Sequence, residues 1–365
     1  MNRIVTKFAL VLLALTLVGG QLQAQFTTTF AKNVAPGQHN GVYYSLPQTM
    51  LKLDFLIEEV KLVKGPLSDY ASNYFELEDA VEYETTEYKL LDVRMTTVSS
   101  PDPNALFFVT MASSRGGKTQ FDVLPNGIIR SVGIGNAADA EVELPTSNKE
   151  PLPCIHAEEA AAEDFIPLMM AGKSYVMMAK EAADKIAEIR KAKYYLISGD
   201  VEMASNPETF KTMYKELDAM EKEYTSLFLG KRLGKKVVKT VYVIPNKEVP
   251  TQTVAKFSET DGLTVGTGGS GTMITVQTLS LNTTAAINAP SQSAIESMSY
   301  ENKVFYRVPE MAHVKVNCGN AILLEDRVTV SQLGAMLIAP LTNTRLVFDT
   351  ETGQIVNMRM QSGLP

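Results

Sequence analysis

Residues 206–230, NPETFKTMYKELDAMEKEYTSLFLG, contain the clearest fold signal in the chain. Asn206 suits a helix N-cap, Pro207 suits the first helical position, and Gly230 suits a C-terminal stop. Apolar side chains recur between these boundaries at a helical spacing and share one face: Phe210, Met213, Leu217, Met220 and Tyr224. The stretch therefore predicts an amphipathic helix.

A second helical pattern comes before this one. Residues 179–196 carry Ala182, Ile186 and Ile189 on one stripe, and a short connection follows. Two amphipathic helices joined in this way are expected to pack antiparallel. Residues 179–230 therefore predict a helical hairpin. Core filling is the ordinary role of its apolar face, and a docking face for a partner, formed by the five side chains named above, is the alternative.

The segments on both sides of this hairpin alternate between apolar and polar residues, which is typical of strands with one buried face. The N-terminal side predicts strands at 42–47, 51–57, 88–97 and 106–111, and a hairpin at 121–129. The C-terminal side predicts strands at 237–244, 254–258, 272–279, 304–309, 314–316 and 321–329, and a hairpin at 346–356. We expect an α+β fold in which antiparallel β modules flank a central antiparallel helical pair.

Composition divides the chain further. Residues 136–164 are rich in Ala, Glu, Asn and Pro, which favours a linker or a mobile loop. We predict a signal peptide (1–24), an N-terminal β-rich module (25–135), a linker or mobile segment (136–178), the helical hairpin (179–230) and a C-terminal β-rich module (231–365).

The two β-rich segments contain a short internal echo. Residues 42–47 read VYYSLP and residues 304–309 read VFYRVP, and a Phe-Asp pair precedes a Gly turn at both Phe121 and Phe348. Two short matches are also expected by chance in a β-rich chain. The alternative is that the two β modules are related.

Residues 1–24 have the three parts of a cleavable secretory signal peptide. A short cationic start is followed by an apolar run at 8–18, and Ala24 precedes the expected new N-terminus, Gln25. The run is about half of the ~20 residues that cross a bilayer. Because the run is this short, a permanent membrane anchor is not expected. No cysteine lies directly after the run, so a lipidated N-terminus is not expected either. We therefore expect an exported protein, periplasmic or associated with the outer membrane, and not a lipoprotein.

The charge balance is acidic. The formal net charge is −7, and removal of Arg3 and Lys7 with the signal peptide takes it to −9. Binding to nucleic acid or to an anionic membrane rests on clustered Lys and Arg, and we find no such run. We therefore expect no nucleic acid partner. No other segment is long and apolar enough to cross a bilayer, so we expect no transmembrane segment in the mature chain.

Cysteine and histidine are scarce, and they fall in the patterns Cys154-x-His156 and His313-x4-Cys318. Because an exported chain enters an oxidising compartment, a disulfide between Cys154 and Cys318 is the first interpretation. Two unpaired thiols are a second. A zinc site built from all four residues is a third, although the spacing is not a usual zinc pattern.

Other patterns predict no catalytic residue, metal ligand or cofactor. The run Gly116-Gly117-Lys118-Thr119 resembles the end of a phosphate-binding loop, but a predicted strand follows it where a helix is required. The glycines at 266–271 lie between predicted strands, unlike those of a dinucleotide-binding fingerprint. Acidic clusters at 76–84 and 158–164 lack the spacing of a calcium loop, and solvated charge explains them.

Four motifs occur together in the order found in a known family. They are Val42-Tyr-Tyr-Ser-Leu-Pro47, Gly65-Pro66 leading to Tyr70-Ala71, Arg190 through Lys193-Tyr-Tyr-Leu-Ile-Ser-Gly199-Asp200, and Glu223-Tyr224 through Leu227-Phe-Leu-Gly230. From about residue 40 to its C-terminus the chain resembles an exported Bacteroidetes family, domain of unknown function 4831. The resemblance implies a cell-envelope location in a diderm bacterium. It implies no activity and no catalytic residue.

These observations favour a non-catalytic binding or scaffold module of the periplasm or outer membrane, with an envelope protein or a polymer as its partner. Two alternatives stay open. One is a periplasmic hydrolase that uses carboxylates or the Cys/His set. The other is a carbohydrate-binding protein, although the chain has no Trp to serve as a sugar platform.

Overall fold

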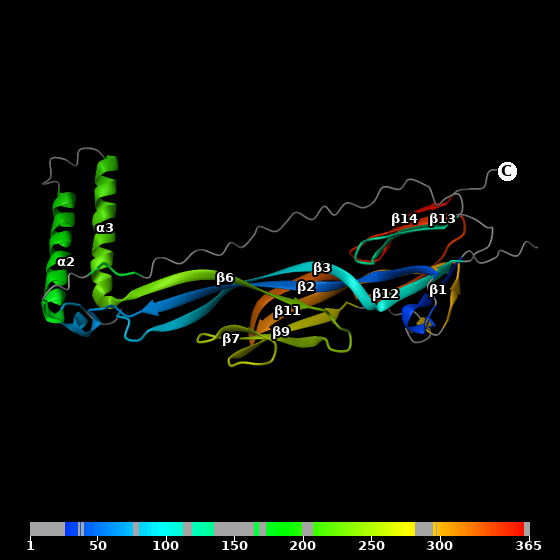
Figure 1. Cartoon of the computed structure of the whole chain (residues 1–365), viewed down its shortest axis with the longest axis horizontal. Coiled ribbons are helices and arrows are strands. Elements are labelled where there is room, and N and C mark those ends of the chain that lie inside the picture. Colours follow the sequence, from blue (N-terminus) through cyan, green and yellow to red (C-terminus); the bar gives the residue numbers. More distant parts are fainter. Residues whose placement is uncertain are drawn as a thin grey trace, which may run out of the picture.

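The computed structural model describes residues 26–35, 37, 40–75, 80–111, 119–134, 164–167, 173–198, 207–281, 295–296 and 298–360. Within these residues the fold is mainly antiparallel β, with two long helices, α2 (Tyr175–Ser198) and α3 (Pro207–Leu229). Figure 1 shows an elongated molecule in which the helices stand side by side at one end and the strands occupy the rest. The α+β class therefore holds, with β-structure predominating.

Three sheets form the body. Sheet A has the strand order β10-β1-β3-β2-β6, sheet B has β14-β13-β5-β4, and sheet C has β12-β11-β9-β7-β8. The strands are β1 (Phe26–Phe30), β2 (Gly41–Val63), β3 (Thr85–Met111), β4 (Thr119–Val123), β5 (Ile129–Ile134), β6 (Lys231–Val243), β7 (Thr251–Ser258), β8 (Gly262–Val265), β9 (Thr272–Ser280), β10 (Tyr300–Glu301), β11 (Lys303–Cys318), β12 (Ala321–Pro340), β13 (Thr344–Phe348) and β14 (Ile355–Met360). Both β-rich segments supply strands to sheets A and B, so they are interleaved in space and the helical pair is at one end.

Four strands are far longer than the sequence patterns predicted. The predicted strands 42–47 and 51–57 are both parts of β2, and 88–97 and 106–111 are both parts of β3. Likewise β11 unites two predicted strands, and β12 continues to Pro340. Pro47 and Pro309 end two of the predicted strands, and Pro101 and Pro103 lie between two others. In the structure these prolines lie at β-bulges, where a strand bends without ending.

The two long hairpins, β2–β3 and β11–β12, carry matching bulges. In the first, the paired positions step from Ser45–Leu106 to Pro47–Pro101. In the second, they step from Val308–Ala335 to Glu310–Val330. Both bulges therefore insert the same number of extra residues into the second strand of the hairpin. When residues 42–47 are aligned with residues 304–309, the two bulges begin within one residue of each other.

The short hairpins that follow also match. The backbone N–H of Ser45 donates to the carbonyl of Gly127 at 2.8 Å, and that of Arg307 donates to the carbonyl of Gly353 at 2.9 Å. Both glycines have positive φ, 91° and 77°, in the turns β4–β5 and β13–β14. The sequence echo therefore has a structural counterpart, a long bent hairpin followed by a short one, which occurs twice.

The long hairpins pass through two hydrophobic cores. The end core lies beside sheet B, and it is formed by residues such as Tyr44, Phe107, Phe305, Val132 and Leu346. The middle core lies between sheets A and C, and it is formed by residues such as Leu51, Phe55, Ile274, Val276 and Val314. We call the segments that join the two cores, 45–49, 101–104, 307–310 and 330–335, the crossing region.

Beyond the middle core, β2, β3 and β6 continue as an arm to the helices (Figure 1). The 23 residues of β2 span about 75 Å at about 3.3 Å per residue. At the end of the arm, the 3-10 helix η2 (Ser68–Asn73) and both helices form a small core that we call the base cluster. It contains Leu67, Ala71, Met178, Ala179, Ala182, Ile186, Leu227 and Phe228.

Both predicted helices are present, with boundaries close to the predicted ones. Gly230 ends α3 with a φ of 81°, which favours glycine. The last carbonyls of a helix need partners outside it, and here the N–H groups of Leu67 and Val81 donate to the carbonyls of Leu227 and Leu229, each at 2.8 Å. Asn206, the predicted N-cap, lies outside the described residues.

Candidate functional site

The crossing region holds the most buried charged pair in the described structure. Arg307 donates through Nη2 to Oδ2 of Asp102, and through Nη1 to the carbonyl of Pro47 at 2.5 Å. The side chains of Arg307 and Asp102 are only 8% and 5% exposed. Burial lowers the pKa of Arg307, and the nearby Asp102 carboxylate partly opposes this effect. The pair therefore links the two long hairpins across the molecule.

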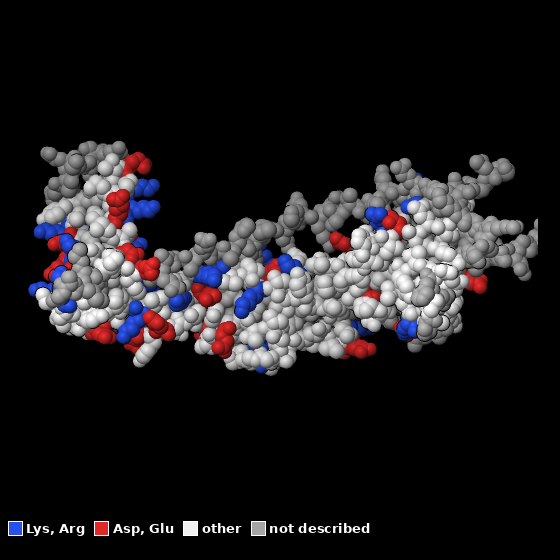
Figure 2. Space-filling view, in the orientation of Figure 1, with Lys and Arg blue, Asp and Glu red and all other residues white. Residues whose placement is uncertain are grey.

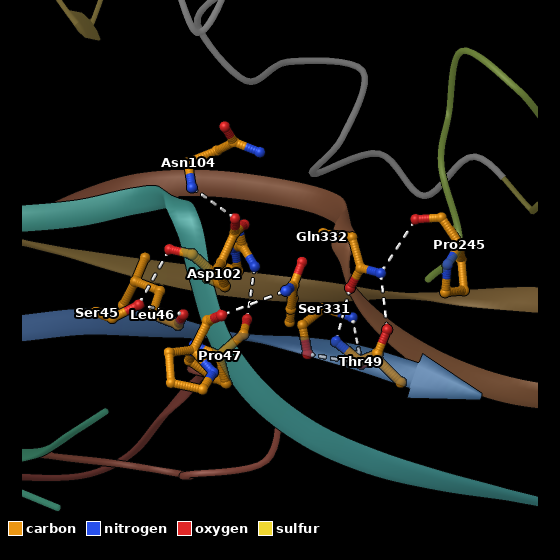
Figure 3. Close-up of polar contacts among 12 residues, drawn as sticks. Ser45, Leu46, Pro47, Thr49, Asp102, Asn104, Pro245, Ser331 and Gln332 are labelled. Atoms are coloured by element: carbon orange, nitrogen blue, oxygen red, sulfur yellow. Dashed lines mark hydrogen bonds and ion pairs between the residues drawn. The ribbon is translucent and has the colours of Figure 1, made fainter. Parts of the chain in front are cut away.

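Asp102 has two further partners in the bulge of β3. Its Oδ1 accepts the backbone N–H of Asn104 at 2.8 Å, and its carbonyl accepts the hydroxyl of Ser45 at 3.1 Å. Figure 3 shows Asp102 among these groups. Ser45 and Arg307 occupy matching positions in the sequence echo, and both contact Asp102. The carboxylate is therefore held in place by the Arg307 guanidinium and the backbone of Asn104.

Gln332 makes a second set of links. Its Oε1 accepts the N–H of Thr49 at 2.8 Å, while its Nε2 donates to the carbonyls of Thr49 at 2.9 Å and Pro245 at 3.1 Å. The hydroxyls of Thr49 and Ser331 lie 3.0 Å apart. Figure 3 shows Gln332 between Thr49 and Pro245. The bulge of β12 is thus joined both to β2 and to the β6–β7 connection.

A cleft of about 850 Å³ opens beside these groups. Arg307, Asp102 and Gln332 line it, together with Asn104 and the segment 244–249 between β6 and β7. Its lining is mostly polar, but the buried groups are already bonded to one another. The arrangement can join two hairpins rigidly. Among the described lining residues, no nucleophile is paired with a base.

The five residues of the predicted docking face all lie on α3. Phe210, Leu217 and Tyr224 are half-buried, whereas Met213 and Met220 are 36% and 49% exposed. Tyr224 also packs against the base cluster. The face therefore lies partly against α2 and partly in solvent.

Charged residues join the two helices on another side. The Nζ of Lys193 lies 2.9 Å from Oδ1 of Asp218 and 2.7 Å from Oε2 of Glu221, and Arg190 reaches the other oxygen of Glu221 at 2.7 Å. Hydrogen bonds from Lys222 and Lys193 lower the pKa of Asp218 to about 2. Those from Lys193 and Arg190 lower the pKa of Glu221. Asp218 also lies 2.8 Å from Nζ of Lys222, one helical turn later on α3.

The Cys/His set is only partly within the described residues. Cys154 and His156 lie outside them, so the disulfide between Cys154 and Cys318 stays a prediction. Cys318 ends β11 and packs against the middle core, where burial raises the pKa of its thiol. His313 lies five residues earlier, on the opposite face of the strand, with Nε2 2.8 Å from Oε1 of Glu325. The structure therefore does not bring His313 and Cys318 together.

The remaining patterns can be placed briefly. The glycines at 266–271 form a turn between β8 and β9, as their positions between strands predicted. Residues 112–118, 76–79 and 158–163 lie outside the described part of the chain. Within that part, no group of three or more metal-binding side chains is present, and no helix is both long and apolar enough to cross a membrane.

Sequence reasoning missed Arg307, Asp102 and Gln332. Arg307 and Asp102 are separated by 205 positions, so no local spacing connects them. The echo gave one usable signal, because it aligned Arg307 with Ser45 and marked a charged residue inside an otherwise apolar strand.

Comparisons with known proteins give one result. No curated protein and no solved structure matches the chain. The family model described as Domain of unknown function (DUF4831) matches residues 40–356, which include both long hairpins and both helices. The chain therefore belongs to the DUF4831 family.

Proposed function

We propose that this protein is an exported, non-catalytic scaffold of the cell envelope that presents a helical hairpin to a partner protein. One observation carries the proposal. The hairpin stands at the end of a long β arm, is attached through the base cluster, and exposes apolar side chains on the face predicted for docking. The location, periplasmic or at the outer membrane without a lipid anchor, rests on the signal-peptide pattern of residues 1–24.

The crossing region supports a scaffold role because its polar groups are used for connection. The buried Arg307–Asp102 pair and the Gln332 bonds join the hairpins that form the body of the molecule. A body joined in this way keeps the arm in a fixed direction. Pre-organisation of this kind lowers the entropy cost of binding at the far end.

The docking face supports a protein partner with an apolar surface. Met213 and Met220 are exposed beside the half-buried Phe210 and Leu217. Methionine adapts its shape to a partner and is common at binding surfaces that contact helices. An apolar stripe at helical spacing is also the pattern that packs into a groove or against another helix.

The test is site-specific photo-crosslinking in living cells, with a photoreactive amino acid at position 220. We expect a discrete adduct in the envelope fraction. The matched control is position 222 on the same helix, because two residues turn the side chain by about 200°, and the side chain of Lys222 is 77% exposed. Met213→Glu should lower the adduct yield from position 220, since it adds a charge to the same face. No adduct, or equal adducts from positions 220 and 222, would contradict the proposal.

A further inference from the structure

Strand β14 forms one edge of sheet B. It pairs with β13 on one side, and none of the described residues pairs with its other side. An open strand edge presents unpaired N–H and C=O groups, which another strand can satisfy.

The side chains of β14 add an apolar row to this open edge. Val356, Met358 and Met360 are 48%, 55% and 72% exposed. Met358 pairs with Leu346 of β13, a fully buried residue of the end core. Because paired residues point to the same face of a sheet, Met358 lies on the face of Leu346. A bulge in the β13–β14 pairing leaves Val356 as the extra residue between Ile355 and Asn357.

Among the described residues, the other edge strands are shorter or carry several charged side chains, whereas β14 carries one, Arg359. The long edge strand β6 carries Lys231, Lys235, Lys236 and Lys239, and lysine on an edge opposes pairing with another sheet. The edge strand β12 exposes charged residues at 325–327, while β4, β8 and β10 have five residues or fewer. Figure 2 shows most of the charges over the helices and the arm, and a smaller group at the sheet B end.

We propose that β14 pairs antiparallel with β14 of a second copy of this chain. A two-fold axis at Met358 sets Met358 opposite itself and Val356 opposite Met360, so that the apolar row meets an apolar row. The same register sets Arg359 opposite Asn357, which avoids two like charges facing each other. A second copy therefore satisfies both the open backbone and the side-chain pattern.

The pairing extends sheet B into a continuous eight-stranded sheet across two copies, since each copy supplies four strands. The helical hairpins lie at the opposite end of each molecule, so the two would point away from the shared sheet (Figure 1). A single strand pair buries less than the ~1,200 Å² typical of stable interfaces. The dimer is accordingly reversible and dissociates on dilution.

Sedimentation velocity of the mature protein over a wide concentration range tests the pairing. We expect a monomer–dimer equilibrium, and Met358→Lys should weaken it at least about tenfold, because like charges directly opposite destabilise a strand pair. Met273→Lys is the matched control, since Met273 is also 55% exposed but lies on β9. A monomer at every concentration, or a dimer that Met358→Lys leaves unchanged, would overturn the proposal.

The register is tested separately by introduced thiols. Met358→Cys should give a disulfide-linked dimer under mild oxidation, because the axis brings position 358 within bonding range of its copy. Val356→Cys alone should not, since it faces position 360. Equal cross-linking of the two variants would reject the register. Both tests are independent of the helical docking face, because Met220→Lys should leave the dimer intact.

Discussion

The crossing region and the helical hairpin both use ion pairs to join two elements, but they do so in different surroundings. Arg307 and its partner Asp102 are almost wholly buried. Lys193 and its partners Asp218 and Glu221 lie at the surface of the hairpin, with side chains 12%, 37% and 20% exposed. The ion pair of the crossing region therefore lies in a low-dielectric interior, whereas the ion pairs of the hairpin lie close to water.

This difference predicts which region is rigid. Removing one member of a buried pair leaves a charge that water cannot reach, whereas exposed partners recover hydration when a pair is broken. The body should therefore depend strongly on its charged pair, and the hairpin should depend mainly on its base cluster.

Arg307→Ala should have the largest effect. It leaves the Asp102 carboxylate buried without its cation, at a cost of about 3–5 kcal/mol in the free energy of unfolding. Chemical denaturation measures the change. Combining it with Asp102→Ala should restore part of the loss, because the uncompensated charge is then absent. A loss below about 1 kcal/mol from Arg307→Ala would show that the pair is hydrated.

Gln332→Ala should have an intermediate effect. It removes the acceptor for the N–H of Thr49 and the donor to the carbonyls of Thr49 and Pro245. Leaving such groups unsatisfied costs about 1–3 kcal/mol. Gln252→Ala is the control, since its bond to the carbonyl of Ile244 is exposed. If the two variants lose equal stability, burial of the Gln332 bonds is not what matters.

Lys193→Ala should have the smallest effect, about 1 kcal/mol or less, because its partners stay partly exposed to water. The helical signal in circular dichroism measures the stability of the hairpin on heating. Overall unfolding of the β body should be unchanged. A global loss as large as that of Arg307→Ala would contradict the contrast between the two regions.

The same network predicts how acid acts on the hairpin. The pKa values of Asp218 and Glu221 are lowered in the folded state, so their contribution is present above the unfolded pKa values and is lost as pH falls through the folded ones. For Asp218 this window runs from about 4 to about 2. The stability of the helices should therefore decline as the pH falls through this window, and the decline should be smaller in Lys193→Ala. A flat response between pH 5 and 2 would count against the network.

Local signals predicted the helices well and the strand ends poorly. Pro207 and Gly230 act through their own backbone angles, so the boundaries of α3 could be found from neighbouring residues. Pro47 and Pro309 also restrict their own backbone. Whether such a proline ends a strand or bends it depends on the paired strand, which is distant in the sequence.

The sequence by itself determined the alternating strands, the helical hairpin with its apolar face, and the positions of the tight glycine turns. These features depend on contacts between residues close together in the chain. Only the tertiary structure decided that the two β-rich segments interleave, that Arg307 meets Asp102, and that β6 is a lysine-rich edge strand while no described residue pairs with the outer side of β14. The physical reason is that pairing and burial are properties of residues brought together from distant positions, and no local pattern encodes which partner arrives.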